Sequence, residues 1–281
     1  MSKKKWGVLV AAGVLAAALA LVGCSSSSTS SASSSSAASA SGSASAQAEM
    51  KLIKDGTLTI ATSPDFPPFE NIENGDLVGL DIEIGKAVAN KLGLEPEFVQ
   101  LQFDNILTAV AGGKQADVGI SGFTVEPERQ KTVDFSDSYY TDDLAIAAMK
   151  DNDDIAADNV DEALNKEGVV IAVQSGTSGE TYVQENYPNA TCQPYGNSTD
   201  AFAAMQAGQA NAVCTNKAVV ERMLASAYTD AQVVKAVATG EEYAIAVNKD
   251  NPELTKKINE ALKELTEDGT VDALMEQYNI K

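Results

Sequence analysis

The stretch GLDIEIGKAVANKLGLEPEFVQL, residues 79–101, decides the fold class. Its first part repeats apolar side chains at helical spacing and stops at Gly93. The apolar face of this expected helix comprises Leu80, Ile84, Ala87, Val88 and Leu92. The segment that follows, EPEFVQL (95–101), has the composition of a strand. A helix joined to a strand by so short a connection indicates an α/β protein.

The neighbouring segments extend this unit in both directions. TLTIAT (57–62) is expected to form a buried strand, FDNILTAVAGG (103–113) a helix, and ADVGIS (116–121) another strand. The resulting β-α-β-α-β order predicts a mostly parallel sheet with helices on its faces. A second unit of the same order follows, which predicts two similar lobes. Its strands are expected at 168–174, 191–196 and 210–216, and its helices at 178–187 and 199–209.

Two cysteines fall in the second unit. Cys192 and Cys214 would lie on the strands either side of the 168–174 strand, if the local strand order is 2-1-3. Two strand spacings are roughly 9.5 Å, which a disulfide cannot span. We therefore expect two free, buried thiols.

Two extended apolar runs, LAIAAMK (144–150) and EEYAIAVNK (241–249), bracket the second unit. They predict that the chain crosses into a second lobe and returns, so that two strands form a hinge. Helices expected at 252–265 and 270–278 would then pack on the first lobe. A cleft between two lobes is a usual ligand site. The predicted boundaries are 50–142 with 243–281 for lobe one, and 143–242 for lobe two with the hinge strands.

The chain begins MSKKKWGVLVAAGVLAAALALVGC (1–24), three lysines followed by an apolar run. This pattern predicts an export signal, and a spanning helix is disfavoured because the serine run after Cys24 carries no positive flank. The ending LVGC resembles the lipobox of bacterial lipoproteins, which implies cleavage before Cys24 and diacylation of its thiol. Residues 1–23 would then be a signal peptide, and the lipid on Cys24 would anchor an extracytoplasmic protein to the cell membrane. Residues 24–49 are almost entirely Ser and Ala, which predicts a flexible lipidated tether.

The composition excludes several classes of function. Acidic residues outnumber basic ones forty to twenty, for a formal net charge of −20. This balance argues against nucleic-acid binding, which requires a basic surface. The chain contains no histidine, which excludes catalysis and metal binding that depend on imidazole. We expect neither a metal site nor a cofactor.

Five motifs occur in an order that points to a known family. They are TSPDFPPFE (62–70), LVGLDIEIGKAVANKLG (77–93), AGGKQADVGISGFTVEPERQKTVDFSDSYY (111–140), VVIAVQSGTSGE (169–180) and NPELTKKINEALKELTEDGTVDALMEQY (251–278). Together they resemble the extracellular solute-binding proteins of polar amino acid ABC transporters, solute-binding family 3, over about residues 50–281. The resemblance implies a two-lobe type II periplasmic-binding-protein fold that closes on its ligand. It also implies a monomeric lipoprotein, without catalytic activity, that delivers a free polar amino acid to an ABC transporter permease.

Arg129 is one of only two arginines, with Arg222, in a chain whose other basic residues are lysines. The resemblance implies that Arg129 grips the α-carboxylate of the ligand. A guanidinium suits this task because its planar fork makes two parallel charge-assisted bonds to a carboxylate. Taken without the resemblance, Arg129 is an exposed base in the first turn of a short helix opened by Pro127.

The same resemblance implies roles for residues close to Arg129. Thr124 is expected to donate to the α-carboxylate, and the Gly122 carbonyl to accept from the α-ammonium, with Ser121 beside them at the strand end. Glu126 stands where relatives usually carry Thr, and it is expected to point away from the ligand. The alternative is that these residues simply form a turn.

Further candidates come from both lobes. Phe66 and Phe103 match aromatic positions that sandwich the aliphatic part of the ligand, although core packing is the commoner fate of Phe. Gln174 matches a position that often contacts the ligand side chain. Thr177 and Ser178 open a helix whose free N–H groups suit an anionic group, and the T-x-x-E pattern also fits a capping box.

Two departures from the family pattern bear on the ligand. Asn216 stands where many relatives carry an Asp that pairs with the α-ammonium, and Ser63 replaces an acid that some binders of basic amino acids use. Both changes favour an uncharged polar amino acid, although Glu70 could restore a negative contact. Two other functions stay open at this point. One is a dehydratase-like or lytic enzyme on the same fold, with Glu70 or Glu126 as its acid or base, and the other is a sensory or adhesin lipoprotein.

Overall fold

A computed structural model describes residues 50–280, which belong to one compact unit of the chain. The expected signal peptide, the lipidation site Cys24 and the Ser/Ala-rich tether lie outside the described residues. Within residues 50–280, none of the helices combines the length and the apolarity that crossing a membrane requires. Export and lipid anchoring therefore stay predictions.

The first sheet has the strand order β5-β1-β6-β13-β7. β1 (Thr57–Thr62) pairs in parallel with β5 (Glu95–Gln100) and with β6 (Val118–Gly119). β13 (Ala246–Val247) pairs antiparallel to β6, and β7 (Asp134–Phe135) pairs antiparallel to β13 at the edge of the sheet. The sheet thus joins strands from the beginning of the described chain to one that lies more than a hundred residues later.

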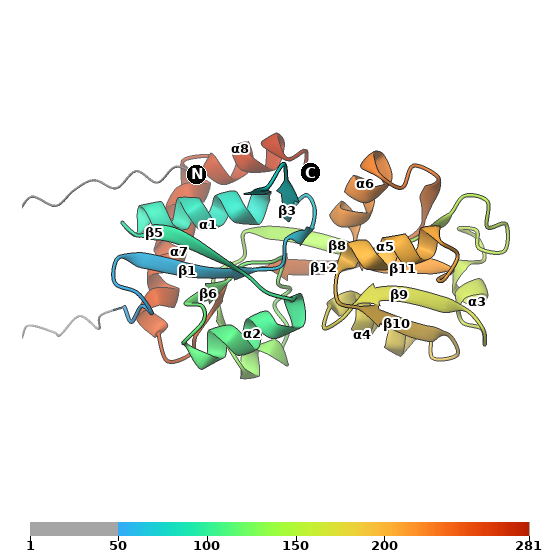
Figure 1. The fold of residues 1–281 in the computed structure, drawn as a ribbon, viewed down its shortest axis with the longest axis horizontal. Helices are drawn as coiled ribbons and strands as arrows, with labels where there is room; N and C mark the ends of the chain where they lie inside the picture. The colour runs from blue at the N-terminus through green and yellow to red at the C-terminus, as the bar shows by residue number, and fades with distance from the viewer. Residues whose placement is uncertain (1–49, 281) are drawn as a thin grey trace, which may run out of the picture. The chain divides into compact units, whose positions relative to one another are not determined.

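Helices flank this sheet where the sequence predicted them (Figure 1). They are α1 (Leu80–Lys91) and α2 (Phe103–Gly112) near the start, and α7 (Pro252–Glu267) and α8 (Thr270–Gln277) at the end. Both C-terminal helices contact α1. The predicted apolar face of α1 is fully buried at Leu80, Ile84 and Val88. We call this sheet and its helices lobe one.

The second sheet has the order β10-β9-β11-β8-β12. β9 (Val170–Gln174) pairs in parallel with β10 (Thr191–Tyr195) and β11 (Ala212–Asn216). β8 (Tyr140–Met149) is antiparallel to β11, and β12 (Ala231–Tyr243) is antiparallel to β8. We call this sheet and its helices lobe two. The helices are α3 (Val160–Leu164), α4 (Ser178–Asn186), α5 (Ser198–Gln206) and α6 (Lys217–Ser226).

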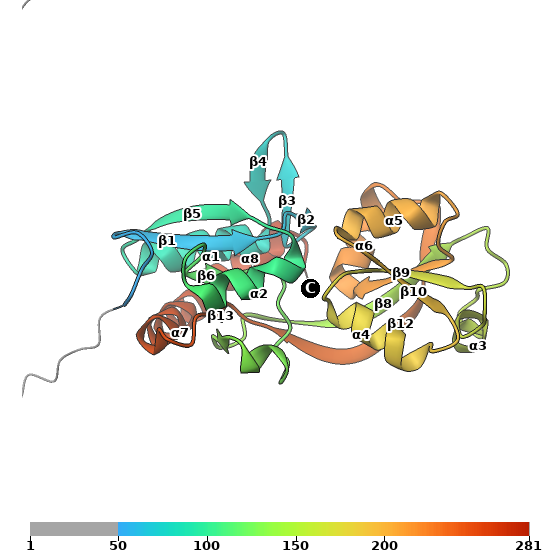
Figure 2. The same cartoon turned by 60° about the horizontal axis from the view of Figure 1, so that its bottom comes forward.

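Two long strands, β8 and β12, connect the lobes. Figure 2 shows them passing side by side from one lobe to the other, and their register runs as far as the pair Tyr140 and Tyr243. They form the predicted two-strand hinge. Each sheet is mostly parallel, as predicted, because only β13 in lobe one and β8 in lobe two run opposite to the other four strands of their sheet.

The strand order of lobe two places β9 between β10 and β11, as predicted. Cys192 and Cys214 therefore lie on strands two spacings apart, and within residues 50–280 neither forms a disulfide. Cys214 is buried, whereas Cys192 is only half-buried, because β10 is the edge strand of the sheet.

A small sheet was not predicted, whereas the short helix that the sequence allowed after Pro127 is present as a single 3-10 turn. β2 (Asp65–Phe66), β3 (Glu70–Glu73) and β4 (Asp76–Val78) form a small antiparallel sheet of their own. A single turn of 3-10 helix, η1 (Arg129–Lys131), follows β6. These elements are too short to show a period, yet β2 and η1 both contribute residues to the site described next.

Candidate functional site

A small, nearly closed cavity lies where residues of the two lobes meet. All ten residues predicted for ligand binding line it, together with three more. The lining comprises Ser63, Asp65, Phe66, Glu70, Phe103, Ser121, Gly122, Thr124, Arg129, Gln174, Thr177, Ser178 and Asn216.

The fold gathers these residues because most of them follow the carboxyl ends of parallel strands. Ser63 comes directly after β1, and Ser121 lies just beyond β6. Thr177 and Ser178 follow the turn after β9, and Asn216 is the last residue of β11. Segments far apart in the sequence thus supply one polar wall from each lobe.

Gly122 shows why the lobe-one loop has its sequence. Its φ of +57° lies in the left-handed region that favours glycine. A Cβ atom there would lie 3.1 Å from the Phe66 ring and 3.2 Å from the Tyr243 ring. Its N–H donates to Oδ2 of the buried Asp81 at 2.7 Å. Conformation and space therefore both require glycine at this turn.

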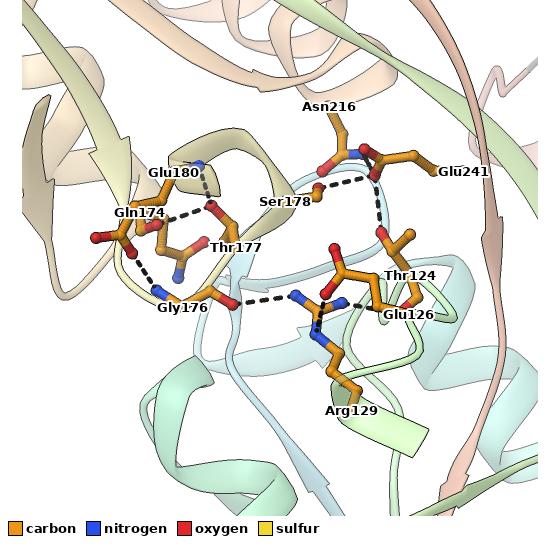
Figure 3. A network of polar contacts seen from close by, with 10 residues as sticks. All are labelled: Thr124, Glu126, Arg129, Gln174, Gly176, Thr177, Ser178, Glu180, Asn216 and Glu241. Atoms are coloured by element: carbon orange, nitrogen blue, oxygen red, sulfur yellow. Dashed lines mark hydrogen bonds and ion pairs between the residues drawn. The ribbon is translucent and has the colours of Figure 1, made fainter. Parts of the chain in front are cut away.

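Arg129 is not the exposed base that its local sequence allows, since its side chain is only 9% exposed. Nη1 donates to the Thr124 carbonyl at 2.8 Å, and Nη2 donates to the Gly176 carbonyl of the other lobe at 3.0 Å (Figure 3). The guanidinium carbon lies 5.6 Å from the centre of the Phe103 ring, a cation–π distance. Burial lowers the pKa of Arg129, while the neighbouring Glu126 and Glu241 carboxylates oppose this effect.

Arg129 keeps hydrogen-bonding capacity for a ligand. A guanidinium has five N–H donors. One Nη1 proton and one Nη2 proton go to backbone carbonyls, and Nε lies 3.1 Å from Glu126 Oε2. One N–H on each terminal nitrogen is therefore left, which matches the two oxygens of a carboxylate.

Glu126 was expected to point away from the ligand, and it does not line the cavity. Its side chain nevertheless stays beside the site. Its carboxylate pairs with the guanidinium of Arg129, as Figure 3 shows. Burial raises the pKa of Glu126, and the charge of Arg129 opposes that rise. Glu126 therefore orients Arg129 from the side of Nε and leaves the two terminal nitrogens to the cavity.

The two predicted aromatic residues serve the wall and the core together. Phe66 is 6% exposed and Phe103 is 8% exposed, and both line the cavity. Phe103 stacks on Phe123 with ring centres 4.7 Å apart, and Phe66 stacks on Phe69 at 5.9 Å. The two interpretations of these rings are therefore compatible.

The start of α4 carries the predicted cap. The Glu180 N–H donates to Thr177 Oγ1 at 3.2 Å, and the Thr177 hydroxyl donates to the Gln174 carbonyl at 2.8 Å. The Glu180 carboxylate accepts from the N–H of Gly176 at 2.7 Å, one residue before the position that a capping box uses. The cap holds Thr177 and Ser178 at the cavity wall.

Asp65 was not among the predicted site residues. Its carboxylate joins the two lobes through hydrogen bonds. Its Oδ2 accepts from the Ser198 N–H at 2.7 Å and from Gln174 Nε2 at 3.3 Å, both in lobe two. The Ser63 hydroxyl donates to Oδ1 at 3.1 Å. Burial raises the pKa of Asp65, and these hydrogen bonds counteract the rise. Ser63 stands where some binders of basic amino acids carry an acid. Asp65, two residues later, supplies an acid to the same cavity.

Glu241 is the second residue that the sequence did not single out. It lies on the hinge strand β12 and is 7% exposed. Its Oε2 accepts three hydrogen bonds: from Thr124 Oγ1 at 2.7 Å, Ser178 Oγ at 2.9 Å and Asn216 Nδ2 at 2.9 Å (Figure 3). Its only sequence signal is an acid at the start of an otherwise apolar extended run.

A pair of buried acids adjoins the lobe-one wall. Glu70 lines the cavity and accepts from the Ser121 hydroxyl at 2.6 Å. Burial, reinforced by the charge of Asp81, raises the pKa of Glu70 well above its usual range. Burial raises the pKa of Asp81 to about 6, although it accepts from the Gly122 N–H and the Tyr139 hydroxyl. The raised pKa of Glu70 favours its protonated form and so avoids two adjacent buried charges.

The described residues show no cluster suited to a metal ion. Within residues 50–280, no three side chains of His, Cys, Asp or Glu gather at metal-binding distances. The chemistry of the cavity is therefore described by hydrogen bonds, one guanidinium and several carboxyl groups.

Comparison with known proteins finds similar chains that are named as arginine-binding proteins. The Arginine-binding extracellular protein ArtP of Bacillus subtilis (strain 168) is 34% identical over 235 residues, which are 79% of this chain and 85% of ArtP. The structure of an ancestral arginine-binding protein bound to arginine is 38% identical, with a TM-score of 0.75 over 82% of this chain and 99% of that one. An ancestral arginine-binding protein bound to glutamine is 39% identical, with a TM-score of 0.74 over 80% of this chain and 98% of that one.

The family model described as "Bacterial extracellular solute-binding proteins, family 3" matches residues 58–281. The match spans nearly all of both lobes and every residue that lines the cavity. The two-lobe architecture, the hinge and the matched sequence agree, and the chain belongs to the bacterial extracellular solute-binding proteins of family 3.

Proposed function

We propose that this protein captures a free polar amino acid in the cavity between its lobes and delivers it to the permease of an ABC transporter. The ten predicted residues make the ligand contacts, with Arg129 on the α-carboxylate and no residue acting as a catalyst. The protein works as a monomer, exported and held on the cell membrane by the lipid on Cys24.

The observation that carries the proposal is the state of Arg129. Burying a guanidinium is costly unless its charge is compensated. Arg129 is 9% exposed, and its contacts leave one N–H on each terminal nitrogen. A carboxylate in the cavity would use both N–H groups and add a second negative charge beside that of Glu126.

The ligand side chain faces acids. Asp65 and Glu70 line the cavity, and Arg129 is the cation among the residues that line it. This arrangement favours a side chain that donates hydrogen bonds over one that carries a negative charge. Glutamine would keep the uncharged ligand predicted from Ser63 and Asn216, whereas arginine would add a charge pair with Asp65. Relatives bound to arginine and to glutamine make both the first ligands to test.

The test is a dye-based thermal melt of residues 47–281, the compact unit, with each of the twenty standard amino acids. A ligand at 100 times its dissociation constant stabilises the folded state by about 2.7 kcal/mol. For a unit of this size we expect a rise in melting temperature of about 5–10 °C. Arg129→Lys keeps a positive charge but loses the fork, and it should lose most of the rise.

Arg222→Lys is the matched control, because Arg222 is the other arginine and its side chain is 44% exposed, away from the cavity. It should respond to ligand as the wild type does. A wild-type protein that folds but responds to no amino acid would contradict the proposed function. An equal response in Arg129→Lys would contradict the role of the guanidinium alone.

A further inference from the structure

Glu241 has an unusual position among the polar groups of the site. It is absent from the cavity lining, yet three residues that line the cavity donate hydrogen bonds to one of its carboxylate oxygens. The donors come from both lobes: Thr124 from lobe one, Ser178 and Asn216 from lobe two. Glu241 therefore stands directly behind a patch of cavity wall.

These bonds determine which hydrogen-bonding groups the wall presents. A hydroxyl has one proton, and the protons of Thr124 and Ser178 are both donated to Glu241. Toward any other partner, the two hydroxyl oxygens can only accept, so the Thr124 hydroxyl does not donate to the α-carboxylate as the resemblance implied. The carboxylate likewise fixes the Asn216 amide, since only its nitrogen can donate to Glu241. The Asn216 carbonyl oxygen is then free to accept elsewhere.

From this geometry we propose that Glu241 is the positioning residue for the ammonium group of the ligand. It turns Thr124, Ser178 and Asn216 into three acceptors and supplies the negative charge that the Asn216 amide lacks. This inference rests on the proposed function. An ammonium group has three N–H donors and one positive charge, which matches three acceptors backed by a carboxylate.

The assignment also orients the ligand. A ligand carboxylate at this patch would face three hydrogen-bond acceptors and a buried negative charge, and both would repel it. The same carboxylate at Arg129 would meet two free N–H groups. The cavity is therefore polarised from Arg129 toward Glu241, and an amino acid zwitterion fits it in one orientation.

A purely structural role is the alternative, since Glu241 links both lobes through the hinge. A structural role would affect every ligand equally, whereas a positioning role concerns only the ammonium group. Des-amino analogues separate the two. L-arginine is compared with 5-guanidinopentanoic acid, and L-glutamine with glutaramic acid, by calorimetry on residues 47–281 of the wild type and of Glu241→Gln.

Gln is isosteric with Glu and uncharged. The wild type should bind the parent amino acid at least about 100-fold more tightly than its des-amino analogue, and Glu241→Gln should reduce this ratio by about 10- to 100-fold. Glu242→Gln is the control, because Glu242 is the exposed neighbour on the same strand. Its ratio should equal that of the wild type.

A second variant protects the test against misfolding. The double change Glu241→Gln with Asn216→Asp moves the charge to the cavity wall and lets the new amide donate to it. It should restore most of the lost ratio. Equal weakening of parent and analogue in Glu241→Gln, or no weakening, overturns this inference and leaves the proposed function intact. A wild type that binds none of the twenty amino acids overturns both.

Discussion

Single residues in this site carry charges that solvent does not stabilise. Arg129 is 9% exposed and Glu241 is 7% exposed, so each depends on neighbouring dipoles. Arg129 finds two backbone carbonyls and Glu126, and Glu241 finds two hydroxyls and an amide. Such networks are sensitive to single substitutions, because removing one partner leaves a buried charge unsatisfied.

Asp142 provides a test of buried charge outside the cavity. It lies on the hinge strand β8, is 7% exposed, and accepts from the N–H groups of Asp143 at 2.8 Å and Ala218 at 3.3 Å. Burial raises its pKa from 3.8 to about 6. The folded protein therefore holds this proton more tightly than the unfolded chain does. The stabilisation is fully present below about pH 4 and is lost as the pH rises through 6.

We expect the melting temperature to fall between pH 4 and pH 7, and to fall less in Asp142→Asn, which cannot titrate. A pKa rise from 3.8 to about 6 corresponds to at most about 3 kcal/mol of stability. Thermal melts across this range measure the slope, with Asp151→Asn in an exposed loop as the control. Identical slopes for the two variants would contradict the raised pKa of Asp142.

Most residues of the site could be predicted, but not what they contact. The resemblance supplied ten positions that the fold brings to one cavity. Asp65 lies inside the motif TSPDFPPFE (62–70), but its contacts with Ser198 and Gln174 lie more than a hundred residues away in the sequence. Glu241 meets Thr124 across 117 positions of sequence, and no local pattern encodes such a contact.

At the scale of elements, the helix α4 depends on a cap that also builds the cavity wall. Thr177 accepts from the Glu180 N–H and donates to the Gln174 carbonyl. Replacing a Thr cap by Ala usually costs about 1 kcal/mol. We therefore expect Thr177→Ala to unfold at a lower denaturant concentration than the wild type, with an unchanged slope.

Thr177→Ser is the matched control for this cap. Ser loses the same methyl group as Ala but keeps the hydroxyl, so its stability should stay close to that of the wild type. Urea titrations without added amino acid separate the cap from any effect on binding. If Ser and Ala were equally destabilising, the methyl group rather than the cap would be responsible.

The longer elements were predicted well because their apolar residues repeat with a clear period. α1 was expected at 79–93 and spans Leu80–Lys91, and β1 matches its predicted bounds. β6 was expected over six residues and has two, because the chain turns into the site directly after Gly119. α6 was not predicted, although Val219, Val220 and Met223 lie on its buried face at helical spacing.

At the scale of the whole described unit, direct contacts join the lobes around the cavity. Arg129 bonds to the Gly176 carbonyl at 3.0 Å, and Asp65 bonds to the Ser198 N–H at 2.7 Å. Figures 1 and 2 show that the hinge strands provide the covalent connection, so these contacts decide how firmly the lobes stay together. A ligand that completes the closed arrangement is bound in proportion to the closed population.

Asp65→Ala should therefore shift the protein toward open lobes. It removes the acceptor of the Ser198 and Gln174 bonds without touching the hinge. We expect a larger radius of gyration in small-angle X-ray scattering without added amino acid, and a lower affinity for whichever amino acid the wild type binds. Asp76→Ala, on the exposed start of β4, should change neither quantity.

The pattern of that loss across ligands separates two roles of Asp65. If Asp65 acts only by joining the lobes, the smaller closed population weakens arginine and glutamine by the same factor, since both bind the same closed form. If Asp65 also pairs with a cationic side chain, the affinity for arginine falls about tenfold more than the affinity for glutamine. Raising the salt concentration should then weaken the binding of arginine to the wild type more than the binding of glutamine. Calorimetry with both amino acids on wild type and Asp65→Ala measures the two factors. An unchanged radius of gyration together with unchanged affinities would show that the contacts of Asp65 with lobe two contribute nothing to closure.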